Sequence, residues 1–268
     1  MERKTIRLGL VGKDVSKSSS DKIHAFILDK WGYNCEYEKF SVNSENFDGA
    51  MRSLLGDFDG FNITIPYKRD VFEYLDSVEG DAFACGAVNT VVNRKGYNTD
   101  GVGFMLMLEN AGINVKDTKV LVLGAGGSGR SSALAMKNAG ANVYMYRRNK
   151  EELEEVCAQL GVNVSTAPEK GGYDIIINCT GVGMHDTVGK SPVEKSAFDG
   201  AKIAVDLIYN PKESAFLQIA KDCGLKTCNG SAMLFYQAYY ADCLYTQRQA
   251  DANEAKILYL NYLEAYGE

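Results

Sequence analysis

Residues Val120 to Gly140 read "VLVLGAGGSGRSSALAMKNAG" and indicate the fold class of this chain. An apolar run precedes Gly124, Gly126 and Gly129, which have the G-x-G-x-x-G spacing, and a helix-like run of small residues follows them. This order provides a tight turn, a close backbone approach to a pyrophosphate, and helix N-terminal amides that face negative charge. We therefore expect a Rossmann-type dinucleotide-binding loop, with a glycine turn that binds no nucleotide as the alternative. The residues expected to contact the cofactor in this loop are Gly124, Ala125, Gly126, Gly127, Ser128 and Gly129.

The next strand-like run indicates which dinucleotide is bound. It ends at Arg147, Arg148 and Asn149, where NAD sites usually carry a carboxylate for the ribose 2′-hydroxyl. Arginine suits a 2′-phosphate by its charge and its forked geometry, so the sequence favours NADP over NAD. The alternative is that both arginines are solvated and pair with Glu151 and Glu152, which follow at once.

Strand and helix patterns alternate along the chain, which predicts an α/β fold. The first hundred residues predict strands at 5–12, 35–42, 61–66, 87–93 and 95–100, and helices at 20–32, 44–56 and 67–76. A helix-like run then leads to a second series of strands, which predicts a doubly wound parallel sheet. That run covers 101–113, the second strands cover 118–127, 141–148, 173–181 and 202–210, and a helical pattern closes the chain at 252–267.

Composition limits the partners of this chain. The 268 residues carry a formal net charge of −6, which argues against a nucleic-acid partner. No apolar run is long enough for a membrane span or for the core of a signal peptide, so we expect a cytoplasmic protein with a small-molecule partner. Seven scattered cysteines without a C-x-x-C pair, and only two histidines, predict neither a disulfide framework nor a metal site.

Several short motifs occur in a fixed order along the chain. They are "NITIPYK" at 62–68, "AVNT" at 87–90, "NTDG" at 98–101, "NCTGVGM" at 178–184, "DLIYNP" at 206–211 and "NGSAMLFYQA" at 229–238. Together with the glycine loop, they resemble the shikimate dehydrogenase family over nearly the whole chain. The resemblance implies that Lys68 is catalytic and that Asp100 is its partner carboxylate.

The same resemblance implies the remaining site residues. Substrate contacts are expected from Ser18, Ser20, Thr64, Asn89, Tyr209 and Gln237. Further cofactor contacts are expected from Thr180, Leu207 and Gly230, the last two near the nicotinamide.

Lys68 also has a chemical case that does not depend on the family. Hydride transfer to a ketone leaves alkoxide charge on the oxygen, so a group that carries positive charge and delivers a proton must lie there. A lysine does both, and Asp100 would orient its ammonium group. Without their motifs, Lys68 would be an ordinary solvated lysine and Asp100 an ordinary turn residue.

The loop "GKDVSKSSSDKIH" at 12–24 departs from the family pattern. The family holds the substrate carboxylate with two serines in a proline-containing frame, and here Ser18 and Ser20 are present while Asp14 and Asp21 replace both prolines. Lys17 replaces a histidine and brings a positive charge near the carboxylate. Hydroxyls at a helix N-terminus bind an anion well, and a serine-rich helix cap is the alternative.

The sequence as a whole predicts an NADP-dependent shikimate dehydrogenase, an oxidoreductase acting on a CH-OH group in aromatic amino acid biosynthesis. We expect a substrate-binding catalytic domain at 1–103, an NADP-binding Rossmann domain at 104–236, and C-terminal helices at 237–268 that pack back on the first domain. The alternatives are a quinate/shikimate dehydrogenase that uses NAD, and a catalytically idle sensor that binds the cofactor. A homodimer is compatible with the sequence.

Overall fold

The structure is a computed structural model, and it describes residues 3–267. The chain forms two compact units. The first unit runs to Gly103 and resumes at Leu234, and the second unit is Phe104–Met233. No helix in the described part of the chain is long and apolar enough to cross a membrane.

The first unit is built on a six-stranded mixed sheet in the order β2-β1-β3-β5-β6-β4. Its first three strands are parallel, whereas β3, β5 and β6 pair antiparallel. The strands are β1 (Thr5–Gly12), β2 (Asn34–Ser41), β3 (Gly60–Ile63), β4 (Ser77–Val78), β5 (Thr90–Val92) and β6 (Lys95–Tyr97). All of the residues of β3 are buried, as expected for a central strand covered on both faces.

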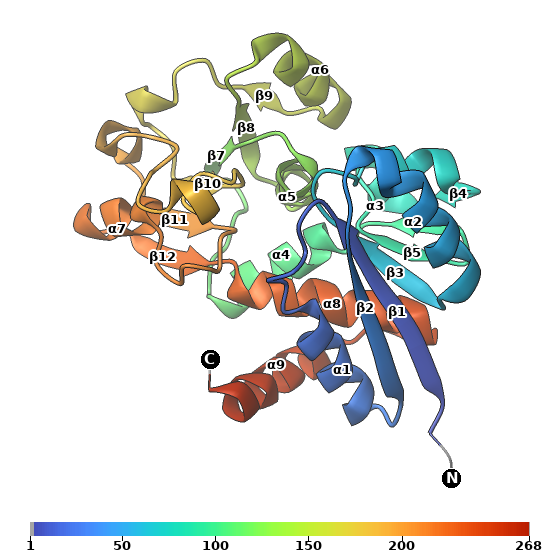
Figure 1. Ribbon diagram of the computed structural model, residues 1–268. Coiled ribbons are helices and arrows are strands. Elements are labelled where there is room, and N and C mark those ends of the chain that lie inside the picture. The colour runs from blue at the N-terminus through green and yellow to red at the C-terminus, as the bar shows by residue number, and fades with distance from the viewer. Residues whose placement is uncertain (1–2, 268) are drawn as a thin grey trace. The chain divides into compact units, whose positions relative to one another are not determined.

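Helices from both ends of the chain complete this unit. In Figure 1, the red helices α8 (Ser231–Thr246) and α9 (Ala252–Tyr266) lie beside the blue α1 (Ser20–Lys30). Phe26 of α1 packs edge to face on Tyr262 of α9, with ring centroids 5.4 Å apart. The other helices that begin in this unit are α2 (Ser44–Asp57), α3 (Gly80–Cys85) and α4 (Asp100–Asn110).

The second unit is a parallel six-stranded sheet in the order β12-β11-β10-β7-β8-β9. The chain starts in the middle at β7 and winds outward first in one direction and then in the other, which is the doubly wound topology. The strands are β7 (Lys119–Leu123), β8 (Asn142–Tyr146), β9 (Asn163–Val164), β10 (Ile175–Asn178), β11 (Ile203–Asp206) and β12 (Lys226–Asn229). The helices are α5 (Gly127–Asn138), α6 (Lys150–Leu160) and α7 (Ala215–Asp222).

The α/β class and the Rossmann-type sheet are therefore confirmed, and three local predictions are wrong. The expected helix at 67–76 is a short 3₁₀ helix, Asp70–Tyr74. The strand expected at 61–66 ends at Ile63, three residues before Pro66, because the chain then turns and the backbone N–H of Tyr67 bonds the carbonyl of Thr64 at 3.0 Å. The segment expected to be strand up to Asp100 ends at Tyr97, and Asp100 begins α4 instead.

Candidate active site

Lys68, Asp100 and Asn89 form a buried polar cluster in the first unit. The ammonium group of Lys68 donates a hydrogen bond to Oδ2 of Asp100, and the side-chain amide of Asn89 donates to Oδ1 at 2.8 Å. The three residues are 8%, 5% and 2% exposed. Buried charges are found where they are paired and hydrogen-bonded, so the cluster holds a cation and an anion in fixed positions.

Local backbone geometry explains why these side chains meet. Asp100 is the first residue of α4, where the helix N-terminus stabilises a carboxylate. The side chain of Asn98 accepts the backbone N–H of Asp100 at 3.0 Å, and that of Asn89 accepts the backbone N–H of Thr99 at 2.8 Å. The backbone carbonyl of Lys68 accepts the N–H of Val88 at 2.8 Å, which ties the lysine loop to the segment that carries Asn89.

Two glycines leave room for two further predicted substrate residues. A Cβ on Gly103 would stand 2.6 Å from the backbone nitrogen of Gln237, so only glycine lets α4 approach α8 this closely. Gln237 accepts a hydrogen bond from Asn89 at 3.3 Å, and it thereby joins the cluster. A Cβ on Gly12 would stand 2.5 Å from Cγ2 of Thr64 at the end of β1.

The serine loop lies at the N-terminus of α1. The hydroxyl of Ser18 bonds the hydroxyl of Ser20 at 3.0 Å and accepts its backbone N–H at 3.2 Å. Ser19 occupies the cap position without a side-chain capping bond. Sequence reasoning singled out Lys17, which is exposed, and missed Lys39, whose ammonium group bonds the carbonyl of Ser18 at 2.9 Å. Lys39 also pairs with Asp21, at 3.1 Å.

The glycine loop in the second unit has the geometry that a dinucleotide requires. Gly124 has φ of +101°, which favours glycine. A Cβ on Gly129 would stand 2.3 Å from the carbonyl oxygen of Gly124, so close helix–strand packing requires glycine there. A Cβ on Gly126 would meet no protein atom within 4 Å. Contacts within the protein therefore do not explain a glycine at this position, whereas a phosphate that approaches the backbone of Gly126 does. The loop thus fits a bound pyrophosphate.

The two arginines at the end of β8 have different surroundings. Arg147 pairs with Glu152 at 2.6 Å, and both side chains are about one third exposed. Within residues 3–267, Arg148 forms no ion pair with an acidic side chain. Arg147 thus shares its charge with a carboxylate, whereas Arg148 has no acidic partner among the described residues.

Polar side chains at the ends of β10 and β11 were not predicted, and they arrange the next loop. Oδ1 of Asn178 accepts both the backbone N–H and the hydroxyl of Thr180, at 3.0 and 2.7 Å. Asp206 is buried, accepts a hydrogen bond from Asn178 at 3.0 Å, and has a pKa raised by burial. The sequence signal was present, because polar residues that end adjacent parallel strands meet at one edge of a sheet.

The predicted nicotinamide neighbours also lie in the second unit. A Cβ on Gly230 would stand 2.1 Å from the carbonyl oxygen of Leu207, so these residues touch through their backbones. A methyl group of Thr180 would lie 3.0 Å from a Cβ on Gly124, which places Thr180 beside the glycine loop. Tyr209 follows β11 and is half-buried, so the second unit carries this one predicted substrate residue and the first unit carries the other five.

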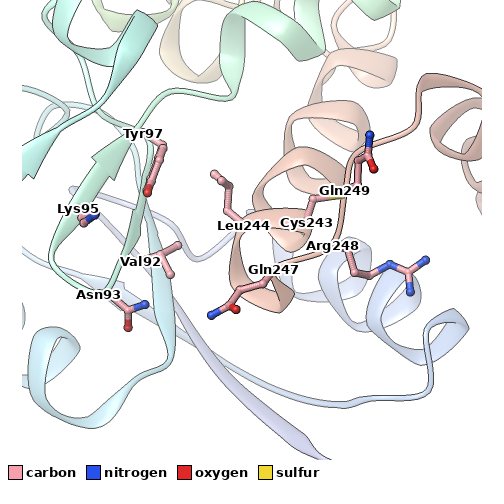
Figure 2. Close-up of a pocket in the computed structure, with 9 residues that line it drawn as sticks. All are labelled: Val92, Asn93, Lys95, Tyr97, Cys243, Leu244, Gln247, Arg248 and Gln249. Carbon is pink, nitrogen blue, oxygen red and sulfur yellow. The ribbon is translucent and has the colours of Figure 1, made fainter.

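A surface hollow of about 510 Å³ lies elsewhere on the first unit. Figure 2 shows that it is lined by the β5–β6 hairpin and by the end of α8 with the residues that follow it. Arg248 at its rim is engaged by Glu254 at 3.2 Å and lies over the ring of Trp31. None of the predicted site residues lines this hollow.

The fold and these sites define a class, the two-domain α/β proteins with a Rossmann-type dinucleotide-binding unit. Residues 10–91 match the model of the shikimate dehydrogenase substrate binding domain, and residues 97–222 match that of the alanine dehydrogenase/PNT C-terminal domain. The chain is 38% identical to a shikimate dehydrogenase (NADP(+)) of Methanococcus aeolicus, over 94% of this chain and 96% of that one. This protein belongs to the shikimate dehydrogenase family.

Solved structures agree with this assignment. A shikimate 5-dehydrogenase from Thermus thermophilus, in complex with NADP(H) and shikimate, is 33% identical with a TM-score of 0.86, covering 94% of this chain and 98% of that one. A shikimate 5-dehydrogenase from Listeria monocytogenes, in complex with shikimate and NAD, is 25% identical with a TM-score of 0.80, covering 96% and 98%. The family thus includes members solved with either dinucleotide.

Proposed function

We propose that this protein catalyses the reversible, NADPH-dependent reduction of 3-dehydroshikimate to shikimate. The observation that carries the proposal is the buried Lys68–Asp100 pair with Asn89 bonded to its second oxygen. It stands in a chain of the shikimate dehydrogenase family that also carries an intact dinucleotide loop.

Lys68 manages the proton of the reaction. NADPH, when bound, supplies the hydride that reaches the ketone carbon. The ammonium group of Lys68 stabilises the negative charge that grows on the ketone oxygen and then donates its proton to that oxygen. Asp100 orients the ammonium group, and Asn89 orients Asp100. In the reverse direction the neutral amine accepts the proton from the substrate hydroxyl.

The other proposed residues bind and orient the reactants. Ser18 and Ser20 hold the substrate carboxylate, with the N-terminal amides of α1 and the nearby Lys39 adding positive potential. Thr64, Asn89, Tyr209 and Gln237 address hydroxyl groups of the substrate.

The glycine loop, with Ala125 and Ser128, would hold the pyrophosphate of the cofactor. Leu207 and Gly230 would lie near the nicotinamide, Thr180 would contact the cofactor beside the glycine loop, and Asn149 would lie beside the adenosine ribose. Arg148 would hold the 2′-phosphate with help from Arg147.

One observation favours a second candidate function, an enzyme that also accepts NAD. The Arg147–Glu152 ion pair lowers the positive charge offered to a 2′-phosphate, and this weakens the discrimination between the two dinucleotides. Steady-state rates with shikimate and quinate, each with NADP and NAD, test both functions on one plate. The proposal predicts the highest kcat/KM for shikimate with NADP, and a higher value for quinate with NAD would refute it.

We further propose a cytoplasmic homodimer. All seven cysteines are unpaired by disulfides, which suits a reducing compartment. Ile257 and Leu260 lie one turn apart on α9 and are 59% and 58% exposed, so they offer apolar surface to a second copy. Light scattering on the purified protein tests the dimer, and a monomer mass at micromolar concentration would contradict it.

A further inference from the structure

A histidine and an aspartate that play no part in the chemistry above form a pair in the interior of the first unit. Nδ1 of His24 on α1 lies 2.6 Å from Oδ1 of Asp242 on α8, and both side chains are 0% exposed. Nε2 of His24 and Oδ2 of Asp242 have no hydrogen-bond partner in the described part of the chain. Such a pair is expensive to bury, because its desolvation offsets much of its attraction.

A gain in stability therefore does not explain why this pair is buried. The residues around it indicate another role. The imidazole of His24 stacks on the ring of Tyr37 on β2, with centroids 5.0 Å apart and the planes inclined by 18°. Ser20 lies beside the hydroxyl of Tyr37 and lowers its burial-raised pKa, and this hydroxyl donates to Oδ1 of Asn62 at 3.3 Å. His24 therefore lies under the aromatic ring whose hydroxyl contacts a proposed carboxylate-binding serine.

His24 and Ser20 are also linked directly along α1. They are four residues apart, so their side chains lie on the same face of the helix, one turn above the other. A shift of α1 relative to α8 would move both residues together. The bond from His24 to Asp242 opposes such a shift, because it joins the two helices at the level of the serine loop.

The same hydrogen bonds continue from Tyr37 to the reacting centre. Asn62 lies opposite Thr90 in the β3–β5 ladder, and its amide donates to the hydroxyl of Thr90 at 3.3 Å and to the carbonyl of Asn89 at 3.2 Å. Thr90 in turn donates to the side chain of Asn89 at 2.9 Å, and Asn89 holds Asp100. Tyr37 thus touches both the proposed carboxylate anchor and the base of the catalytic cluster.

We propose that the buried His24–Asp242 pair is a positioning element for substrate binding, which fixes α1 and the Tyr37 ring so that Ser20 meets the substrate carboxylate. The inference rests on the proposed function, because it assigns a support to that substrate site. The pair acts through Tyr37 and Ser20, and it touches neither the substrate nor the cofactor.

Charged and titratable groups from each packed element face this pair. They are Cys35 and Tyr37 on β2, and Cys243 and Tyr245 on α8, each of which interacts with the Asp242 carboxyl group. Burial raises the pKa of Asp242 to about 6, although the neighbouring His24 favours the charged carboxylate. Because Cys35 and Tyr245 also have pKa values raised by burial, they stay neutral at physiological pH, and the hydrogen bond between imidazole and carboxyl group is what joins the two helices.

The experiment compares variants of the pair in the full-length enzyme. In His24→Leu and Asp242→Leu, KM for shikimate should rise by about three- to tenfold, the equivalent of one hydrogen bond, while kcat and the Kd of NADPH stay within about twofold. Asp242→Asn keeps an oxygen that accepts from the imidazole, so its KM should remain near that of the wild type. Tyr37→Phe should raise KM like His24→Leu, and the two changes together should raise it no further than the larger single change.

Ile27→Val is the matched structural control, because Ile27 is fully buried on the same helix. It should lower the melting temperature and leave KM for shikimate unchanged. If the two leucine variants lower only the melting temperature, the pair is structural and the proposal is refuted. A KM for Asp242→Asn equal to that of Asp242→Leu would also refute it.

If either leucine variant fails to fold, Tyr37→Phe decides, and an unchanged KM in that variant refutes the proposal. The wild type is measured first. A wild type that does not reduce NADP with shikimate would overturn the proposed function together with this inference, whereas an active wild type with unchanged variant KM values overturns the inference alone.

Discussion

Replacing Lys68 by methionine separates the chemistry of the site from its structure. Methionine keeps the length of the side chain and removes the charge. Because acid–base help is typically worth 10² to 10⁴ in rate, kcat for shikimate oxidation should fall by about that factor, or about 3 to 5 kcal/mol in the barrier. The carboxylate and the hydroxyl groups of the substrate are held by other residues, so KM should change by less than about fivefold.

The burial of the pair adds a stability effect that can be measured independently. Lys68→Met leaves the Asp100 carboxylate buried without the ammonium group of Lys68, while Asn89 still donates to Oδ1. We expect a loss of about 3 kcal/mol in the free energy of unfolding, at the lower end of the range for a broken buried pair. The double variant Lys68→Met with Asp100→Asn removes the stranded charge. It should therefore regain stability and remain as slow as the slower single variant.

The assay is NADPH formation at 340 nm with saturating shikimate, beside fluorescence titration of NADPH and urea unfolding of each variant. Lys68→Arg is the control for charge, and it should recover little activity because a guanidinium group does not release its proton near neutral pH. A Lys68→Met enzyme that keeps more than about a tenth of the wild-type kcat would refute the proton-transfer role, since the loss would fall below the range for an acid–base group.

Further substitutions test three separate parts of the protein. Arg148→Ala should raise KM for NADP by roughly tenfold, since charged hydrogen bonds are worth about 1.5 to 3 kcal/mol. Arg147→Ala should raise this KM less. Glu152→Gln should lower it, because the change releases Arg147 from its ion pair. Ser20→Ala should raise KM for shikimate with the Kd of NADPH unchanged. Asp242→Asn should remove a pH dependence of stability. The carboxyl group of Asp242 stays protonated up to pH about 6 in the folded wild type, but only up to about 3.8 in the unfolded chain. The free energy of unfolding should therefore fall by up to about 3 kcal/mol as pH rises between these values, and the variant should lack this fall.

Each of these expectations has its own control. Kinetics with NAD should change little in the arginine variants, and equal losses for both cofactors would show that the arginines do not bind the 2′-phosphate. An unchanged KM for shikimate in Ser20→Ala would leave the serine loop as a helix cap only. Parallel stability curves for wild type and Asp242→Asn between pH 4 and 6 would show that the pKa of Asp242 is not raised.

Local pattern was sufficient to predict the dinucleotide unit. The apolar run, the glycines and the helix of small residues are contiguous in sequence, and the loop at Gly124 depends on that order alone. Predictions failed where nonlocal hydrogen bonds decide the element. The segment at 67–76 has a helical pattern, yet its start is a run of turns whose Lys68 carbonyl accepts the backbone N–H of Val88, and only a short 3₁₀ helix follows.

Some residues of the candidate active site were likewise predicted from the sequence, and others were missed. Motif order singled out Lys68, Asp100 and Asn89, which the structure brings into one cluster. Lys39 was missed because it comes from a neighbouring strand, 21 residues from the serine whose carbonyl it contacts. The His24–Asp242 pair spans 218 residues, and no local pattern in a single sequence indicates that a histidine on the first helix meets an aspartate on the eighth.

In the proposed reaction, hydride passes directly from the carbinol carbon of shikimate to NADP. Shikimate deuterated at that carbon, incubated with the wild-type enzyme and NADP, tests it most directly when the nucleotide product is examined by mass spectrometry. We predict that the NADPH formed carries one deuterium per turnover, and that Lys68→Met forms the same labelled product far more slowly. NADPH without deuterium, or no reduction of NADP by shikimate, would contradict the account.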